Sequence, residues 1–124
     1  MTDFDRNRYM SLGTFRRSGT EVATPVWFAA DNGKLYVFTA GESGKVKRLL
    51  HSPRARVAPS DVRGRVLGPW RQATARILTE RDPIEQARAA LRAKYGWQMR
   101  LGDLLSRLTG RIRRRAWIEV TFEP

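Results

Sequence analysis

One junction organises this chain: Leu35-Tyr36-Val37-Phe38-Thr39-Ala40-Gly41-Glu42-Ser43-Gly44-Lys45-Val46-Lys47-Arg48. An apolar segment gives way to small residues and then to a basic helical pattern, which predicts a strand, a short loop and a helix. Ser43 belongs to the residue types preferred at a helix N-cap, and the first turn of a helix presents unpaired N–H groups. With Lys45 and Arg48 nearby, such a junction can bind a phosphate group. An ordinary solvated helix start has the same composition, so both interpretations stay open here.

Length and charge limit what the protein can be. The chain has 124 residues, with 24 Lys plus Arg against 12 Asp plus Glu and a formal net charge of +12. This length predicts one domain, residues 1–124, around a single core. The charge predicts an anionic partner without separating nucleic acid, an anionic membrane and a polyanionic small molecule.

Cysteine and histidine are scarce in this sequence. The sequence has no cysteine and one histidine, which excludes a disulfide framework and argues against a zinc site, so we expect no bound metal. No apolar segment has the length of a signal peptide or a membrane span. We therefore expect a cytoplasmic protein that makes no membrane contact.

Three strands are predicted up to the junction. Tyr9–Arg17 and Glu21–Ala30 are extended segments separated by a turn at Ser18-Gly19-Thr20. Asp31-Asn32-Gly33 has the residue types that tolerate positive φ and predicts a second tight turn, into the strand Lys34–Ala40. The middle strand is apolar on both faces, which predicts that it is covered on both sides.

Pro25 lies within that middle strand. Proline cannot donate to a strand ladder, so this point is predicted to lie at an edge or a bulge, where a ligand can approach the backbone. Simple protection of a strand edge is the alternative interpretation.

The pattern after the junction completes a barrel. The helix Gly44–Ser52 is predicted to bury one stripe, formed by Val46, Leu49 and Leu50. The remaining elements are predicted as strands at Arg54–Val62 and Trp70–Glu80, a helix from the N-cap Asp82 to Tyr95, a second helix with Leu101, Leu104, Leu105 and Leu108 on one face, and a closing strand at Ala116–Phe122. About six antiparallel strands with flanking helices predict a mainly β protein, a small barrel with the helices packed outside.

Familiar catalytic and nucleic-acid motifs are missing. There is no Cys/His pair and no Gly-x-Ser-x-Gly motif, so we assign no catalytic residue. The basic run Arg111–Arg115 can contact phosphates, but Trp117 and Phe122 fall within an alternating strand rather than on an exposed stacking surface. Nucleic-acid binding is therefore the weakest of the hypotheses for the anionic partner.

Short motifs along nearly the whole chain resemble one known superfamily. They are Leu12–Phe15 with Gly19-Thr20, Thr24–Phe28, Leu35–Ala40 with Ser43–Leu49, Ser52–Val57, Gly64–Trp70 and Lys94–Trp97. Together they resemble the pyridoxamine 5'-phosphate oxidase-like (PNPOx-like) split barrels, a fold also known as the FMN-binding split barrel. The similarity is greatest to the branch that depends on the deazaflavin coenzyme F420.

The resemblance implies a homodimer with two cofactor grooves at the subunit interface. It implies a phosphate site at the strand-to-helix junction, a ring system along the second strand, and a connection between the fourth and fifth strands that reaches toward the groove of its own or the partner subunit. The residues that match these parts are Ser43, Lys45, Lys47 and Arg48 with Thr39 for the phosphate, Thr24, Pro25 and Val26 for the ring, and Gly68 and Trp70 for the connection.

Departures from the family pattern bear on the cofactor. FMN-dependent members carry arginine where this chain has Ala23 and Gly44, which favours coenzyme F420 over FMN. Arg54 and Arg56 are available for the longer anionic chain of that coenzyme. The implied function is hydride transfer from the reduced cofactor to a small unsaturated or quinone-like acceptor. The alternatives are an FMN-binding split-barrel protein and a non-catalytic F420 carrier.

Overall fold

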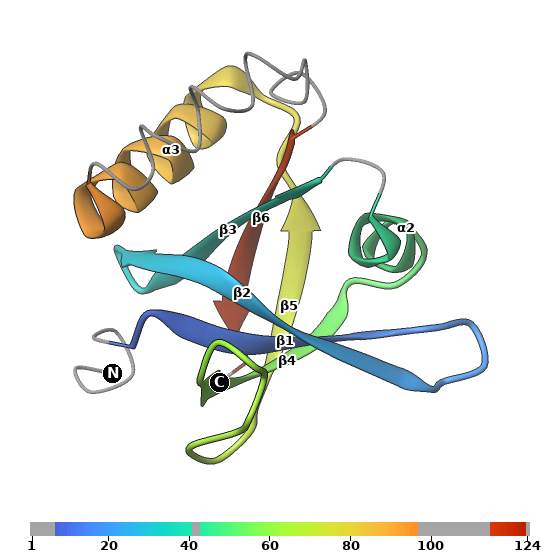
Figure 1. Ribbon diagram of the computed structural model, residues 1–124. Coiled ribbons are helices and arrows are strands. Elements are labelled where there is room, and N and C mark those ends of the chain that lie inside the picture. The colour runs from blue at the N-terminus through green and yellow to red at the C-terminus, as the bar shows by residue number, and fades with distance from the viewer. Residues whose placement is uncertain (1–6, 41–42, 97–114, 124) are drawn as a thin grey trace.

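The computed structural model describes residues 7–40, 43–96 and 115–123. Within these ranges six strands form one closed antiparallel barrel in the order β1-β2-β3-β6-β5-β4, and β4 pairs again with β1 (Figure 1). The strands are β1 (Tyr9–Phe15), β2 (Glu21–Asp31), β3 (Lys34–Ala40), β4 (Arg54–Ser60), β5 (Arg71–Ile77) and β6 (Arg115–Phe122), and the described helices are α2 (Gly44–His51) and α3 (Arg81–Tyr95). The prediction of a mainly β barrel with about six antiparallel strands is confirmed.

Tight turns set the register of the first three strands. At the β2–β3 turn Asn32 and Gly33 have φ of 53° and 77°, the conformation that asparagine and glycine tolerate best. The turn aligns Asp31 with Lys34 and, further along, Phe28 with Val37. The predicted meander is therefore confirmed.

Strand alternation separates two apolar layers. The barrel interior is filled by fully buried side chains that include Met10, Leu12, Phe28, Leu35, Val37, Ile118 and Val120. Leu49 of α2 joins the same cluster, so this helix closes one end of the barrel. The outer layer consists of Ala29, Tyr36 and Trp117 packed against Ala87, Leu91 and Tyr95 of α3. Figure 1 shows α3 lying along the outside of the barrel, well separated from α2.

The barrel opens locally between β2 and β3. The two strands pair only from Phe28 to Asp31, whereas β2 pairs with β1 from Glu21 to Trp27. Among the described residues, the first half of β2 therefore has a strand on one side only. Pro25 lies in this half, opposite Ser11 of β1, so the prediction of an edge position is confirmed.

Several predicted boundaries are wrong. β1 ends at Phe15, β4 ends at Ser60, and β5 spans only Arg71–Ile77. Helix α3 starts two residues earlier than predicted, with Glu80 instead of Asp82 at the N-cap and Asp82 in its first turn. The predicted helix around Leu101–Leu108 lies outside the described residues.

The predicted stripe of α2 is also partly wrong. Val46 and Leu49 are buried, but Leu50 is 74% exposed, because a helix this short turns only one narrow face toward the barrel end. By length and apolarity, neither of the described helices qualifies as a membrane span.

Candidate functional site

Helix α2 begins immediately beyond the end of β3. Ser43 is extended, with φ of −66° and ψ of 156°, and its hydroxyl accepts a hydrogen bond from the Val46 N–H at 3.4 Å. This confirms the predicted N-cap. The first turn of α2 contains no acidic residue, so nothing in that turn offsets the positive end of the helix dipole.

Arg48 folds back over this first turn. Its Nε donates a hydrogen bond of 2.6 Å to the hydroxyl of Thr14, a fully buried residue of β1. On the other side, a Cβ added to Gly44 would lie 2.6 Å from Nη1 of Arg48. The guanidinium therefore occupies the space that a side chain at Gly44 would need.

Three cations gather at this end of the barrel. Burial and, secondarily, the charge of Arg48 lower the pKa of Lys45 below its usual 10.5. Burial and then the charge of Arg16 lower the pKa of Arg48. Neither Lys45 nor Arg48 forms an ion pair with any carboxylate of the described residues. A cluster of like charges without a counter-ion among the described residues is suited to an anion such as phosphate.

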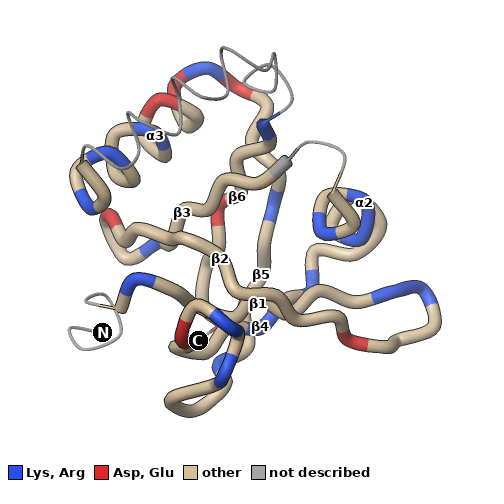
Figure 2. The backbone as a smooth tube through the Cα atoms, viewed as in Figure 1, with Lys and Arg blue, Asp and Glu red and all other residues tan. Residues whose placement is uncertain are grey.

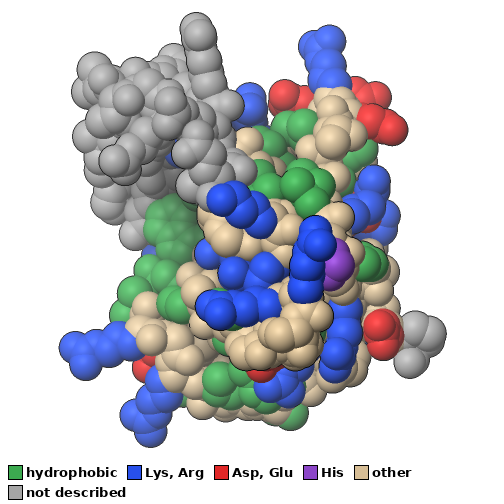
Figure 3. Space-filling view, turned by 90° about the vertical axis from the view of Figure 1, so that its right-hand side faces the viewer, with side chains coloured by type: hydrophobic (Ala, Val, Ile, Leu, Met, Phe, Trp, Pro, Cys, Tyr) green, Lys and Arg blue, Asp and Glu red, His purple; other side chains and the backbone are tan. Residues whose placement is uncertain are grey.

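The figures show how one-sided this charge is. In Figure 2 the charged residues of α2 are all basic, whereas α3 carries charged residues of both signs. Figure 3 views the side of the molecule that carries α2, and blue side chains gather there around the only histidine of the chain. The surface around the cluster is therefore basic as well.

The other residues predicted for the phosphate lie near this cluster but not within it. Thr39 is half-buried near the end of β3, opposite Ala116 of β6. Lys47 is exposed on α2, and its backbone N–H donates to the Ser43 carbonyl at 3.3 Å. The structure thus groups Ser43, Lys45 and Arg48, with Lys47 pointing into solvent beside them.

The segment predicted for the ring lies on the open edge of β2. Val26 points into the core and Pro25 is exposed. The hydroxyl oxygen of Thr24 is buried and has no hydrogen-bond partner among the described residues. A buried polar atom without a partner is costly unless another group approaches it, and this one fits a ligand lying along the strand.

Gly68 and Trp70 lie against the outside of β4. A Cβ at Gly68 would come within 2.8 Å of Pro59 Cγ. The guanidinium of Arg56 lies 4.2 Å from the centroid of the Trp70 ring and also pairs with Glu21. The described contacts do not connect these residues with α2 of the same chain. Arg56 is thus already neutralised, which leaves Arg54 as the better candidate for an anionic tail.

Thr14 and Arg16 are functional candidates that the sequence did not reveal. Thr14 meets Arg48 across 34 positions of sequence, and only the barrel closure brings them together. Nothing in the local pattern around Thr14 signals this contact. Its motif, Leu12–Phe15, is visible in the sequence, but the motif assigns no role to the hydroxyl.

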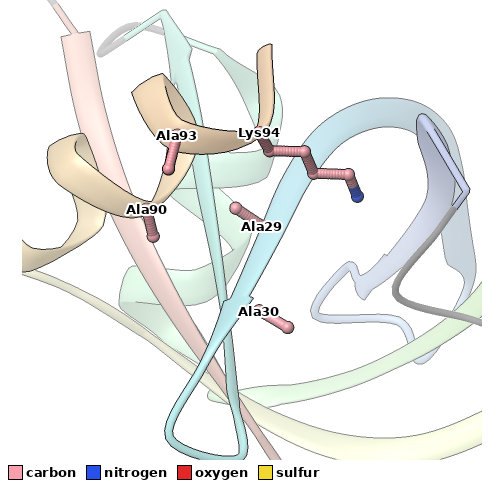
Figure 4. Close-up of a pocket in the computed structure, with 5 residues that line it drawn as sticks. All are labelled: Ala29, Ala30, Ala90, Ala93 and Lys94. Carbon is pink, nitrogen blue, oxygen red and sulfur yellow. The ribbon is translucent and has the colours of Figure 1, made fainter. Parts of the chain in front are cut away.

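A separate pocket lies on the α3 side of the barrel. It has a volume of about 310 Å³ and is lined by Ala29, Ala30, Ala90, Ala93 and Lys94. Figure 4 shows the small side chains of β2 and α3 facing this space, with Lys94 extending beside it. None of the residues predicted for the cofactor lines this pocket.

Solved structures share this architecture. The heme storage protein HutZ from Vibrio cholerae superposes with a TM-score of 0.76 at 13% identity, covering 99% of this chain and 87% of that one. The protein Rv2991 from Mycobacterium tuberculosis superposes with a TM-score of 0.70 at 19% identity, covering 98% of this chain and 78% of that one. An FAD-binding protein from Mesorhizobium loti superposes with a TM-score of 0.65 at 16% identity, covering 98% of this chain and 85% of that one. At such identities the likeness shows the fold alone.

Sequence comparison defines the family. No curated protein matches the chain. The profile described as pyridoxamine 5'-phosphate oxidase, however, matches residues 2–124, and the barrel order and the β3–α2 junction agree with it. The chain belongs to the pyridoxamine 5'-phosphate oxidase family of split barrels.

Proposed function

We propose that this protein is an oxidoreductase that binds coenzyme F420 and reduces a small unsaturated or quinone-like acceptor. The observation that carries the proposal is the cluster of Lys45, Arg48 and Arg16 beside the N-terminus of α2, without a described carboxylate to neutralise it. A phosphodiester is an anion of the right chemistry for this cluster. The resemblance of the sequence motifs to the branch that depends on coenzyme F420 is the reason for proposing this ligand.

Each part of the site has a role in this proposal. Ser43 keeps the first turn of α2 in place, and Lys45 and Arg48 supply the charge that holds the phosphate. The open edge of β2 offers backbone groups and the Thr24 hydroxyl to the ring system. When bound, the reduced deazaflavin supplies a hydride, and the protein orients the cofactor and shields it from water.

FMN is the second candidate cofactor. The FAD-binding protein of Mesorhizobium loti has the same fold, and Ser43 with Lys45 suits any phosphate monoester. Ala23 is exposed and Gly44 bears no side chain, so neither adds a cation for the more highly charged phosphate of FMN. This difference in available charge favours coenzyme F420.

A carrier without catalysis is the alternative function. The fold is shared with a heme storage protein, and no catalytic group has been assigned among the described residues. Turnover separates the two functions. Reduced cofactor mixed with a panel of quinones and unsaturated lactones should be oxidised faster in the presence of protein, and an unchanged rate at tight binding would establish a carrier.

We also propose that two copies form the functional unit. Large apolar side chains are exposed on α2 and on the connection between β4 and β5, namely Leu50 at 74%, Val62 at 59%, Leu67 at 58% and Val66 at 39%. Covering them with a second subunit would remove this apolar surface from water. Sedimentation should give twice the chain mass, and Leu67→Glu should shift the equilibrium toward monomer. A wild-type monomer at high concentration would reject the dimer.

Fluorescence titration tests the cofactor. Coenzyme F420 should bind at micromolar concentration, FMN more weakly, and riboflavin, which lacks the phosphate, weakest. Raising the salt concentration should weaken the binding of coenzyme F420 more than the binding of riboflavin, because only coenzyme F420 depends on the cation cluster. Lack of binding by both phosphorylated cofactors, together with retardation of an oligonucleotide in a gel, would replace this proposal with nucleic-acid binding.

A further inference from the structure

We propose that Thr14 is a positioning residue of the anion site, and that its buried hydroxyl holds the Arg48 guanidinium over the bare backbone of Gly44. The inference rests on the proposed function, because the cation being positioned is the one assigned to the cofactor phosphate. It adds a residue of β1, and the space left by the missing side chain of Gly44, to a site otherwise formed by the β3–α2 junction.

The anchor is rigid. Thr14 is fully buried and lies between two strand partners, Val22 of β2 and Ala55 of β4. Its hydroxyl accepts the Nε–H of Arg48 at 2.6 Å, a short distance for a hydrogen bond from a charged donor. A long arginine side chain otherwise samples many rotamers, so this bond selects one of them.

Gly44 makes room for the selected rotamer. A Cβ at this position would come within 2.6 Å of Arg48 Nη1, 3.4 Å of Cζ and 3.5 Å of Nη2. All three atoms belong to the flexible end of one side chain, so a methyl group would displace the guanidinium and leave the backbone in place. Alanine is also a better helix former than glycine. Gly44→Ala should therefore remove the cation from its position without unfolding α2.

Electrostatics explains why an anchor is needed. Arg16 and Lys45 both lie close enough to Arg48 to perturb it or be perturbed by it, and burial lowers the pKa of both Lys45 and Arg48. Without an anion, repulsion favours an Arg48 that swings into solvent. The Thr14 hydroxyl opposes this movement, so the free protein already holds its cation where the phosphate is to bind. Such pre-organisation strengthens binding because less ordering remains to be done.

The experiment compares four variants by coenzyme F420 titration. Thr14→Val keeps the shape of the side chain and removes the acceptor, and Thr14→Ser keeps the acceptor. We expect about tenfold weaker binding for Thr14→Val and for Gly44→Ala, and affinity within about twofold of wild type for Thr14→Ser. Thr74→Val, an exposed threonine of β5, is the matched control and should bind as the wild type does.

A cycle with Arg48→Met separates positioning from a general effect on the fold. Thr14→Val should weaken binding in the wild-type background and have no further effect once Arg48 is absent. Wild-type affinity in Thr14→Val, or an equal loss in both backgrounds, would overturn the role of Thr14 while leaving the cofactor site intact. If the wild-type protein binds neither coenzyme F420 nor FMN, the proposed function fails and this role fails with it.

Discussion

The two described helices pack against the barrel in opposite ways. Under α3 polar groups are matched: the Phe28 N–H donates to the Tyr95 hydroxyl at 2.9 Å, and this hydroxyl donates to the Arg8 carbonyl at 2.6 Å. At α2 the cations Lys45 and Arg48 are crowded together without a described carboxylate. The contrast supports the proposal that the α3 side stabilises the fold and that the α2 end binds an anion.

The largest expected effect comes from reversing one charge at the α2 end. Lys45→Glu should weaken coenzyme F420 binding about 100-fold, because it replaces an attractive charge by a repulsive one in a partly buried site. The midpoint of urea unfolding should stay within the range typical of surface substitutions. Arg81→Glu at the start of α3 makes the same change in net charge and should leave affinity unchanged. Equal losses in both variants would mean that only the overall charge of the protein matters.

The reverse pattern is expected when the α3 side is altered. Tyr95→Phe leaves the Phe28 N–H without its acceptor and should lower the free energy of unfolding by about 2 kcal/mol, with little change in cofactor affinity. Urea unfolding and titration of the same preparation measure the two quantities. Loss of affinity at unchanged stability would contradict the division between the two regions.

Alkaline pH sharpens the same test. Burial raises the pKa of Tyr95 to about 12 from its usual 10.0. The neutral hydroxyl therefore contributes its full stability below pH 10, and this contribution is lost as pH rises toward 12. The stability difference between wild type and Tyr95→Phe should shrink across this window. A constant difference would show that the pKa of Tyr95 is the same in the folded and the unfolded protein.

A smaller loss of stability is expected when the ion pairs of Glu119 on β6 are removed. Glu119 is nearly buried and lies 3.1 Å from Arg76 Nε and 3.6 Å from Lys34 Nζ. Both cations are substantially exposed, so solvent screens the pairs. Glu119→Gln should cost about 1 kcal/mol of unfolding free energy. Glu85→Gln, which breaks an exposed pair on α3 at 3.7 Å from Arg88, should cost almost nothing, and equal costs would refute the effect of burial.

The smallest expected effect is a gain in stability, on removal of the charge of Lys45. Burial and Arg48 lower the pKa of Lys45, so the unfolded chain binds this proton more tightly and the charged form costs stability at neutral pH. Lys45→Met should therefore raise the melting temperature of the free protein by about 1 to 2 °C. The stability advantage of Lys45→Met should decrease as pH rises toward 10.5, because Lys45 of the wild type loses its proton over this range. A destabilised Lys45→Met would show that Lys45 supports the fold.

Local sequence predicted the framework well where local interactions determine it. Ser43 caps α2 as expected, and Asn32-Gly33 forms the β2–β3 turn. Local cues failed at Asp82, because the N-cap of α3 is Glu80, two residues earlier. They also failed at Leu50, because only the packed structure shows how narrow the buried face of α2 is.

The candidate site was predicted in part. The Ser43, Lys45 and Arg48 group follows from a continuous stretch of sequence, whereas the Thr14 contact with Arg48 depends on barrel closure across 34 positions. The pairing of Arg56 with Glu21 spans 35 positions and was equally hidden. Contacts of this kind need the register of three strands, which no local pattern specifies.

The most direct test of the central claim is an NMR titration of isotopically labelled protein with coenzyme F420. We predict that the backbone amide signals of Gly44, Lys45 and Val46 shift in a saturable way, while those of α3 from Arg81 to Leu91 stay in place. Shifts concentrated in α3, or no saturable shift at the start of α2, would contradict the account.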